Sequence, residues 1–320
     1  MTAQPRGSAL YERFDPYLLG QRQFRAMNTT IQLYTRDVED VGMLPAAEQV
    51  FHLMEARLSR FLPDSELSQF NERSGQEVEI SPILFDVLQR AAELHRATGG
   101  VFEPAVLTAL EAAGYDRSFE KVAPAEDSAP RETDDRHSIA QLKANHSRIT
   151  ATMPAGMRID LGGIGKGYTV DAACRMLEPA ANFVVNAGGD IFASGEGPDG
   201  DGWLVSITDP RALDQSVCLV RLYDEAVATS TTAVRRWQRG GRLQHHLIDP
   251  RTRRPSESGV LSASVITGSA TEADVFAKAA LLLGPEAGTD FLDRQEAHGL
   301  FVMEDGRIIA TEGWPGTPNG

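Results

Sequence analysis

Residues 159–171 read IDLGGIGKGYTVD, the stretch of the chain that says most about its fold. Apolar and polar residues alternate over Met157–Leu161, which predicts a strand, and the apolar spacing from Val170 to Leu177 predicts a helix. Glycines fill the turn between them: Gly162, Gly163, Gly165 and Gly167. Such glycines let backbone approach a ligand closely, and the N-terminus of the following helix offers N–H groups to an anion.

Two common phosphate-binding patterns do not fit this turn. A P-loop needs glycine at position 160 and serine or threonine at position 167, where this chain has Asp160 and Gly167. A dinucleotide fingerprint that starts at Gly163 needs glycine at position 168, which is Tyr168. A tight strand-to-helix turn without any ligand stays open as an interpretation.

Strand and helix patterns continue on both sides of this stretch. Alternation of Ile31 and Leu33 predicts a strand at Thr29–Arg36, and strand-like runs between glycine turns predict strands at Asn182–Asn186, Trp203–Thr208 and Leu261–Thr267. Helical spacing predicts helices at about 50–61 before Pro63, from Pro82 to before Gly99 with Ser81 as N-cap, and at about 271–283 before Gly284. This mixture predicts an α+β fold. We expect a polar N-terminal arm (1–26), one domain (27–320), and an exposed loop rich in proline and acidic residues near 122–136.

Charge and composition narrow the possible functions. The 320 residues include 31 Lys and Arg against 45 Asp and Glu, a net charge of −14, which argues against nonspecific nucleic-acid binding. Cys174 and Cys218 are far apart in the sequence and form no metal-binding spacing. No apolar stretch approaches the roughly 20 residues of a spanning helix. We therefore expect a cytoplasmic protein that does not insert into a membrane.

Further segments carry side chains suited to chemistry. NAGGD (186–190) is typical of a hairpin turn, and ATSTT (228–232) clusters hydroxyl groups. In QHHLIDP (244–250), His245 and His246 are neighbours at a strand end, so at most one of them faces a given site.

The segment that begins at Ser269 predicts a capped helix with two charged residues on one face. Ser269 and Glu272 have the spacing of a capping box. Asp274 and Lys278 lie one turn apart, which indicates either a surface ion pair or, for Asp274, a metal ligand. The spacing alone does not decide between the two.

In this order, the segments together resemble the ApbE family of flavin transferases. The resemblance runs from about Met27 to Gly284. Besides the segments above, it includes MNTT (27–30), LSRFLPDSELSQFN (58–71), GGVFEP (99–104), VNAGGDIFASGEG (185–197), HHLIDPRT (245–252) and ADVFAKA (273–279). It implies a magnesium-dependent enzyme that cleaves FAD, passes FMN to a threonine hydroxyl of an acceptor protein and releases AMP.

The resemblance also implies roles for single residues. His246 would be the catalytic base. Residues expected to contact FAD are Met27, Phe61, Gly100, Phe102, Glu103, Asp160, Lys166, Tyr168 and Leu247. Gly165 and Asp274 would bind the metal, whereas Lys278 replaces the family's usual threonine and, having only donors, is not a ligand. Two alternatives stay open: an FAD-binding protein without turnover, and a pyrophosphatase that cuts FAD to FMN and AMP.

Overall fold

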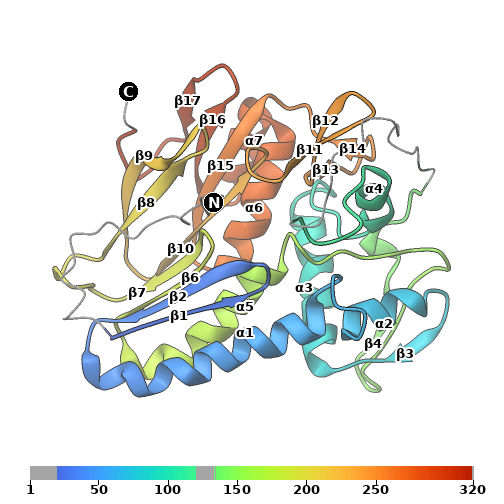
Figure 1. The fold of residues 1–320 in the computed structure, drawn as a ribbon, viewed down its shortest axis with the longest axis horizontal. Coiled ribbons are helices and arrows are strands. Elements are labelled where there is room, and N and C mark those ends of the chain that lie inside the picture. Colours follow the sequence, from blue (N-terminus) through green and yellow to red (C-terminus); the bar gives the residue numbers. More distant parts are fainter. Residues whose placement is uncertain (1–19, 120–132, 134, 319–320) are drawn as a thin grey trace, which may run out of the picture. The chain divides into compact units, whose positions relative to one another are not determined.

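The computed structural model describes residues 20–119, 133 and 135–318 (Figure 1). The chain divides into two compact units. The first unit comprises Met1–His52, Lys166–Ala233 and Gly259–Gly320, and the second comprises Leu53–Gly165 and Val234–Ser258. Both units mix helices and strands, so the predicted α+β class is confirmed.

The first unit is built on an eight-stranded sheet in which every neighbouring pair is antiparallel. In sheet order its strands are β1 (Gly20–Ala26), β2 (Thr29–Thr35), β6 (Phe183–Ala187), β7 (Asp190–Ser194), β10 (Glu225–Thr231), β15 (Val260–Thr267), β16 (His298–Met303) and β17 (Ile308–Ala310). Its other elements are η1 (Val38–Met43), α1 (Leu44–Leu58, in this unit as far as His52), α5 (Gly165–Leu177, in this unit from Lys166), η4 (Glu178–Ala180), β8 (Trp203–Asp209), β9 (Ala212–Leu222), α6 (Ala270–Leu283) and α7 (Pro285–Arg294).

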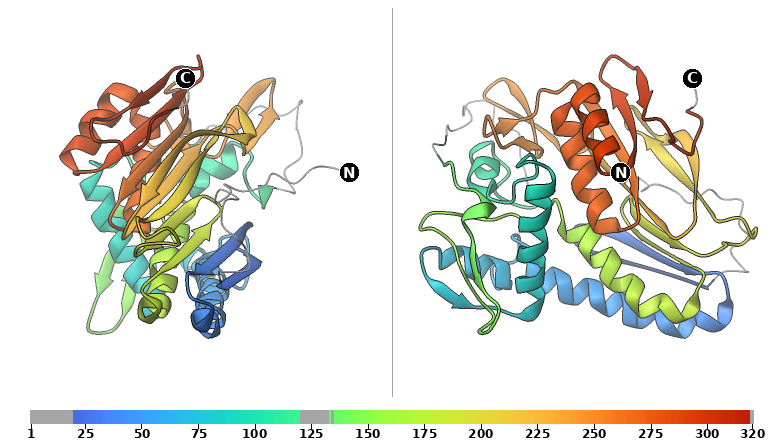
Figure 2. Two further views of the ribbon diagram at one scale, coloured as in Figure 1. Left: turned by 90° about the vertical axis from the view of Figure 1, so that its left-hand side faces the viewer. Right: turned by 180° about the vertical axis from the view of Figure 1, so that it is seen from behind.

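The two faces of this sheet bury different partners, because successive strand residues point to opposite sides. Val185 and Ala228 belong to a core that also contains residues of α1, α5 and α6. Val184 and Val227 belong to a second core, which includes Trp203 and its neighbours on the β8–β9 hairpin. The sheet therefore lies between a helical layer and a hairpin, and Figure 2 shows α5 and α6 along one face.

The second unit consists of short elements. Its helices are α2 (Glu66–Glu72), α3 (Pro82–Ala97), α4 (Leu107–Ala112) and η3 (Ile139–Gln141). Its strands form the three-stranded sheet β3 (Glu77–Glu79), β5 (Thr150–Thr152), β4 (Lys143–Asn145), and the hairpins β11 (Arg236–Arg239) with β12 (Arg242–His245) and β13 (Ile248–Asp249) with β14 (Arg254–Pro255). A core around Leu110, Tyr115, Trp237 and Ile248 joins α4 to the hairpins.

The predicted strand at Met157–Leu161 is wrong, although the residues alternate in burial as a strand would. The N–H and C=O of Ile159 bond to the side chain of Asn71 at 2.8 and 2.9 Å, and the N–H of Asp160 bonds to Pro104 O at 2.9 Å. These distant partners replace a neighbouring strand. The alternation of apolar and polar residues therefore predicted correctly which side chains are buried. It did not predict that the backbone bonds to distant segments rather than to a strand.

Helices with local capping signals agree with the sequence analysis. Ser81 accepts a hydrogen bond from Leu84 N at the start of α3, and Ser269 accepts one from Glu272 N at the start of α6. The helix predicted from the spacing at Val170 begins earlier, at Gly165, so part of the glycine run is helical. The helix predicted near 50–61 spans Leu44–Leu58.

Two predicted segments differ from the structure or lie partly outside it. Residues 20–26, assigned to the polar arm, form β1 and pair with β2. Because most residues of β1 are exposed, its sequence lacks the apolar–polar alternation by which a strand is predicted. Residues 1–19 of the predicted arm lie outside the described part of the chain, as do residues 122–132 and 134 of the loop predicted near 122–136. Among the described residues, no helix combines the length and the apolar character that crossing a membrane requires.

Candidate active site

The second unit gathers aromatic rings around a buried arginine, Arg60. Its side chain is 5% exposed, and its Nε lies 3.4 Å from Asp160 Oδ1. Its guanidinium carbon lies 4.1 Å from the centre of the Phe61 ring and 4.6 Å from that of Tyr115. A carboxylate and two ring faces thus hold the cation. Two predicted FAD contacts, Phe61 and Asp160, share this cluster.

The same aromatic group reaches the predicted base. The Tyr115 ring stacks on Trp237 with centroids 5.5 Å apart, and the centroid of the His246 imidazole lies 6.3 Å from that of Tyr115. Trp237 donates its ring N–H to Ala113 O at 2.8 Å. The second unit therefore brings His246 and Phe61 to the same tyrosine, although 185 positions separate them in the sequence.

The two histidines predicted at the strand end have different surroundings. His245 is 8% exposed, and its two ring nitrogens contact Ser256 O at 3.0 Å and Leu247 N at 3.3 Å. These main-chain contacts assign His245 a structural role. His246 lies one residue beyond β12 and is half-buried. Leu247, predicted to contact FAD, is buried.

The predicted contacts at 100–103 belong to a tight turn after α3. Gly100 has φ +85°, a value that favours glycine, and Phe102 is 1% exposed. Glu103 is also buried, and its Oε1 accepts hydrogen bonds from Ala105 N at 2.9 Å and Ile139 N at 2.8 Å. Glu103 therefore stabilises the chain around it, whatever its relation to a ligand.

In the first unit, the predicted metal ligand Asp274 lies where α5 and α6 touch. Asp274 is 6% exposed, and its Oδ2 accepts a hydrogen bond from Gly167 N at 3.3 Å. Gly167 has no room for a side chain, since a Cβ there would lie 2.2 Å from Ala270 O. Gly167, the second glycine of GKG, is thus required by the close approach of α5 and α6. This approach brings the α5 backbone to the Asp274 carboxylate.

A second carboxylate, Asp171, fixes the same helix contact. It accepts hydrogen bonds from Ala270 N at 2.8 Å, from Thr271 N at 2.9 Å and from the Thr271 hydroxyl. It satisfies N–H groups that the first turn of α6 leaves without helical partners. Burial raises the pKa of Asp171, and these hydrogen bonds oppose that shift. The last residue of IDLGGIGKGYTVD therefore positions the helix that carries Asp274.

The remaining predicted contacts of the first unit lie on α5 and at a hairpin turn. Lys166 forms an ion pair with Asp190, whose side chain is 2% exposed. Asp190 follows the Gly188–Gly189 turn between β6 and β7, where both glycines have positive φ, so NAGGD is the hairpin turn that the sequence predicted. Tyr168 is half-buried on α5. Met27 occupies the β1–β2 turn with φ +52°.

The residues predicted at the metal site, the ligands Gly165 and Asp274 and the non-ligand Lys278, are divided between the units. Gly165 ends the first segment of the second unit, whereas Asp274 and Lys278 belong to the first unit. Among the residues that the structure describes, no group of three or more His, Cys, Asp and Glu side chains could hold a metal ion. Mg²⁺ does not require such a group, because it commonly binds one or two carboxylates, substrate phosphates and water. The donor chemistry of Asp274 and a main-chain carbonyl fits that ion.

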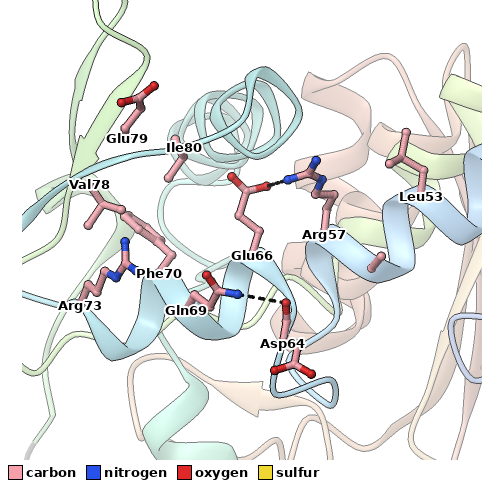
Figure 3. Close-up of a pocket in the computed structure, with 11 residues that line it drawn as sticks. Leu53, Arg57, Asp64, Glu66, Gln69, Phe70, Arg73, Val78, Glu79 and Ile80 are labelled. Carbon is pink, nitrogen blue, oxygen red and sulfur yellow. Dashed lines mark hydrogen bonds and ion pairs between the residues drawn. The ribbon is translucent and has the colours of Figure 1, made fainter.

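A pocket in the second unit lies elsewhere. It has a volume of about 440 Å³, and residues of α1, α2 and β3 line it (Figure 3). None of the predicted site residues lines it. Two of its charged side chains pair with each other, since Arg57 Nη1 lies 3.2 Å from Glu66 Oε2. The internal pairing and the absence of predicted residues argue against this pocket as the active site.

Some residues of these clusters were not singled out by the sequence analysis. Arg60 lies within the quoted LSRFLP segment and Asp171 ends the glycine motif, so both had a local signal. Tyr115 and Trp237 have none, because their importance comes from contacts between distant segments.

Comparisons with known proteins agree with the resemblance. Residues 27–301 match the ApbE family. An FAD:protein FMN transferase of Treponema pallidum is 32% identical over 84% of this chain and 80% of its own length. One of Salmonella typhimurium is 28% identical over 79% of this chain and 75% of its own length.

Solved structures give the same result. The ApbE protein of Thermotoga maritima superposes with a TM-score of 0.82 at 25% identity, covering 92% of this chain and 97% of its own. The flavin transferase ApbE of Vibrio cholerae gives a TM-score of 0.76 at 25% identity, covering 92% and 98%. With the family match spanning most of the sequence, the chain belongs to the ApbE family.

Proposed function

We propose that this protein is an FAD:protein FMN transferase. The observation that carries the proposal is its 32% identity, over 84% of the chain, to a relative with that name. In the proposed reaction, a threonine oxygen of an acceptor protein bonds to the phosphorus on the FMN side of the FAD pyrophosphate. The bond from that phosphorus to the bridging oxygen breaks, and AMP leaves with the oxygen.

We assign His246 as the base that accepts the threonine proton. The contrast with His245 supports this choice, because both ring nitrogens of His245 contact main-chain atoms. A general base must come within hydrogen-bond reach of the hydroxyl. The half-buried His246 at the end of β12, beside the ring of Tyr115, suits that role better.

The other predicted residues would bind and orient FAD. Phe61 offers an aromatic face to a flavin ring, and Arg60 and Asp160 hold that region rigid. Lys166 provides a point charge that suits a phosphate oxygen, and Asp190 fixes the position of its ammonium group. The remaining proposed contacts are Met27, Gly100, Phe102, Glu103, Tyr168 and Leu247.

We further propose that the enzyme uses Mg²⁺. Asp274 and the Gly165 carbonyl would hold the ion, and Lys278 would not ligate it. A bound magnesium ion would offset negative charge on the pyrophosphate. In the structure, the Gly167 N–H and the close contact of α5 with α6 hold the Asp274 carboxylate in place.

Product analysis tests the proposal. The purified protein is incubated with FAD and Mg²⁺, with and without a panel of threonine-containing acceptor proteins. Covalent flavin on an acceptor, in equal amount to released AMP, is the expected result. Free FMN and AMP without any flavinylated protein would identify a pyrophosphatase, and unchanged FAD would identify a binding protein. A His246→Ala sample controls for spontaneous hydrolysis.

A further inference from the structure

One segment of the second unit carries a charge opposite to that of the whole chain. Val234–Ser258 contains seven arginines but only two acidic residues, Asp249 and Glu257, which gives +5. Because the chain carries −14, the rest of it carries −19. This basic segment includes the β11–β12 hairpin (Figure 1) and also His246.

Some of these arginines have structural roles. Arg251 bonds to Asp249 at 2.8 Å, and the buried Arg253 donates to Ala105 O at 2.6 Å. Arg236 and Arg254 also have interaction partners. The other three arginines lie on or beside the β11–β12 hairpin: Arg235, Arg239 and Arg242.

The hairpin places two of these cations directly opposite each other. Its register pairs Arg239 with Arg242 across a turn of Gly240 and Gly241, whose φ values of +56° and +69° suit a tight two-residue hairpin. Like charges in directly opposite strand positions are unfavourable. The hairpin thus holds an arrangement that its own fold disfavours.

No carboxylate in the described part of the chain relieves this repulsion with an ion pair. Arg239 helps to lower the pKa of Asp116, but Arg117 already engages that carboxylate at 2.7 and 2.9 Å. The Nε of Arg239 is buried and makes no hydrogen bond within the described residues. Arg242 is exposed, as is its neighbour Leu243 at 51%. The tip of the hairpin therefore presents the Arg242 cation and an apolar side chain to solvent, beside the half-buried Arg239.

We propose that the β11–β12 hairpin docks an acidic segment of the acceptor protein. The proposal rests on the transferase function, which requires a second polypeptide to bring a hydroxyl to His246, one residue beyond β12. A short acidic segment gains from the hairpin charges, whereas the −19 of the remaining chain repels a long polyanion such as RNA. Complementary charge would speed the encounter and fix the acceptor's register.

A binding experiment tests the docking surface separately from catalysis. Fluorescence anisotropy measures the affinity of the FAD-loaded protein for a labelled peptide with one threonine between aspartates, and for the same peptide with asparagines. We expect the acidic peptide to bind about tenfold more tightly or better. Higher salt should reduce that preference, since exposed charges are screened.

Matched charge reversals then locate the surface. Arg235→Glu with Arg242→Glu should weaken acidic-peptide binding about tenfold or more. Arg96→Glu with Arg148→Glu, the same charge change at exposed positions of the second unit, should leave it nearly unchanged. FAD binding, followed by flavin fluorescence, should remain the same in both variants. Equal binding of the two peptides, equal losses in the two variants, or a loss of FAD affinity at the hairpin would overturn the proposal.

The two proposals fail in different ways. If the wild-type enzyme releases FMN and AMP but flavinylates no acceptor, the transferase function fails, whereas the anisotropy still reports on the hairpin. If flavinylation proceeds with the same KM in wild type and in the Arg235→Glu, Arg242→Glu variant, the function stands and the docking surface is wrong.

Discussion

The α5–α6 contact and the β11–β12 hairpin differ in how their charged side chains are paired within the protein. At the helix contact, Asp171 accepts hydrogen bonds from the first turn of α6, Asp274 accepts one from Gly167 N, and Gly167 lets the two backbones approach closely. At the hairpin, Arg239 and Arg242 occupy directly opposite positions, and neither forms an ion pair with a carboxylate in the described part of the chain. The first arrangement fixes a geometry, and the second leaves charge available to another molecule. A larger side chain should therefore disturb the helix contact, whereas a change of charge should affect the hairpin.

The largest expected effect is at the residue that follows the hairpin. His246→Ala should lower the rate of FMN transfer by about 10²- to 10⁴-fold, the usual contribution of a general base. FAD binding should persist. His245→Ala should instead lower thermal stability, because it removes contacts with Ser256 and Leu247. Single-turnover assays and melting curves of both variants distinguish these roles, and similar rate losses with similar stabilities would contradict them.

The next largest effect is expected when a larger side chain is placed in the contact between α5 and α6. Gly167→Val should destabilise the protein by about 1–3 kcal/mol or more, because its Cβ would meet the Ala270 carbonyl. Urea unfolding measures the loss. Gly268→Ala, where a new Cβ meets nothing within 4 Å, is the control and should be nearly neutral. A Gly167→Val protein as stable as the control would mean that α5 and α6 separate easily.

The sequence predicted those elements that depend on local interactions better than those that depend on distant ones. α3 and α6 were predictable because Ser81 and Ser269, their caps, act within a few residues. The strand predicted at Met157–Leu161 failed because its hydrogen bonds go to Asn71 and Pro104, which no local pattern reveals.

The candidate site follows the same rule. Asp274 and His246 were predicted as site residues because the order of motifs resembled a family. Tyr115, which contacts Arg60, Trp237 and His246, was missed because those contacts join distant segments. Long-range packing is thus the part of the site that one sequence does not reveal.

A smaller effect concerns the magnesium ion that we propose at Asp274. Lys278→Thr should lower the magnesium concentration for half-maximal activity by about tenfold, because a hydroxyl one turn from Asp274 can ligate the ion and an ammonium cannot. Lys278→Met is the matched control, since it removes the charge without adding an oxygen. A shift shared by both variants would assign the effect to charge alone. No shift in the threonine variant would exclude a displaced ligand.

Two carboxylates, the half-buried Asp171 and the buried Asp249, should respond to pH in opposite directions. Burial raises the pKa of Asp171 above 3.8, so its contribution to stability is complete below the unfolded value and declines as pH rises through the folded one. Burial also favours the neutral form of Asp249, but hydrogen bonds from Arg251 outweigh it and lower the pKa. The contribution of Asp249 is therefore present above 3.8 and is lost as pH falls through the folded value.

Urea midpoints of wild type, Asp171→Asn and Asp249→Asn, measured from about pH 6 to about pH 3, check this contrast. The advantage of wild type over Asp171→Asn should grow on acidification toward 3.8, and its advantage over Asp249→Asn should shrink below that value. Trends in the same direction would mean that the helix N-terminus stabilises the Asp171 carboxylate more than burial opposes it.

The smallest effect is on the stability of the hairpin. Arg242→Gln removes one of two like charges in directly opposite positions, so the free energy of unfolding should stay constant or rise by up to about 1 kcal/mol. Arg221→Gln is the same change on β9, where it breaks the ion pair with Asp201 and should give a small loss. Urea unfolding at low salt measures both. If Arg242→Gln were as destabilising as Arg221→Gln, Arg242 would have an internal partner, and the charge at the hairpin tip would serve the fold rather than an acceptor.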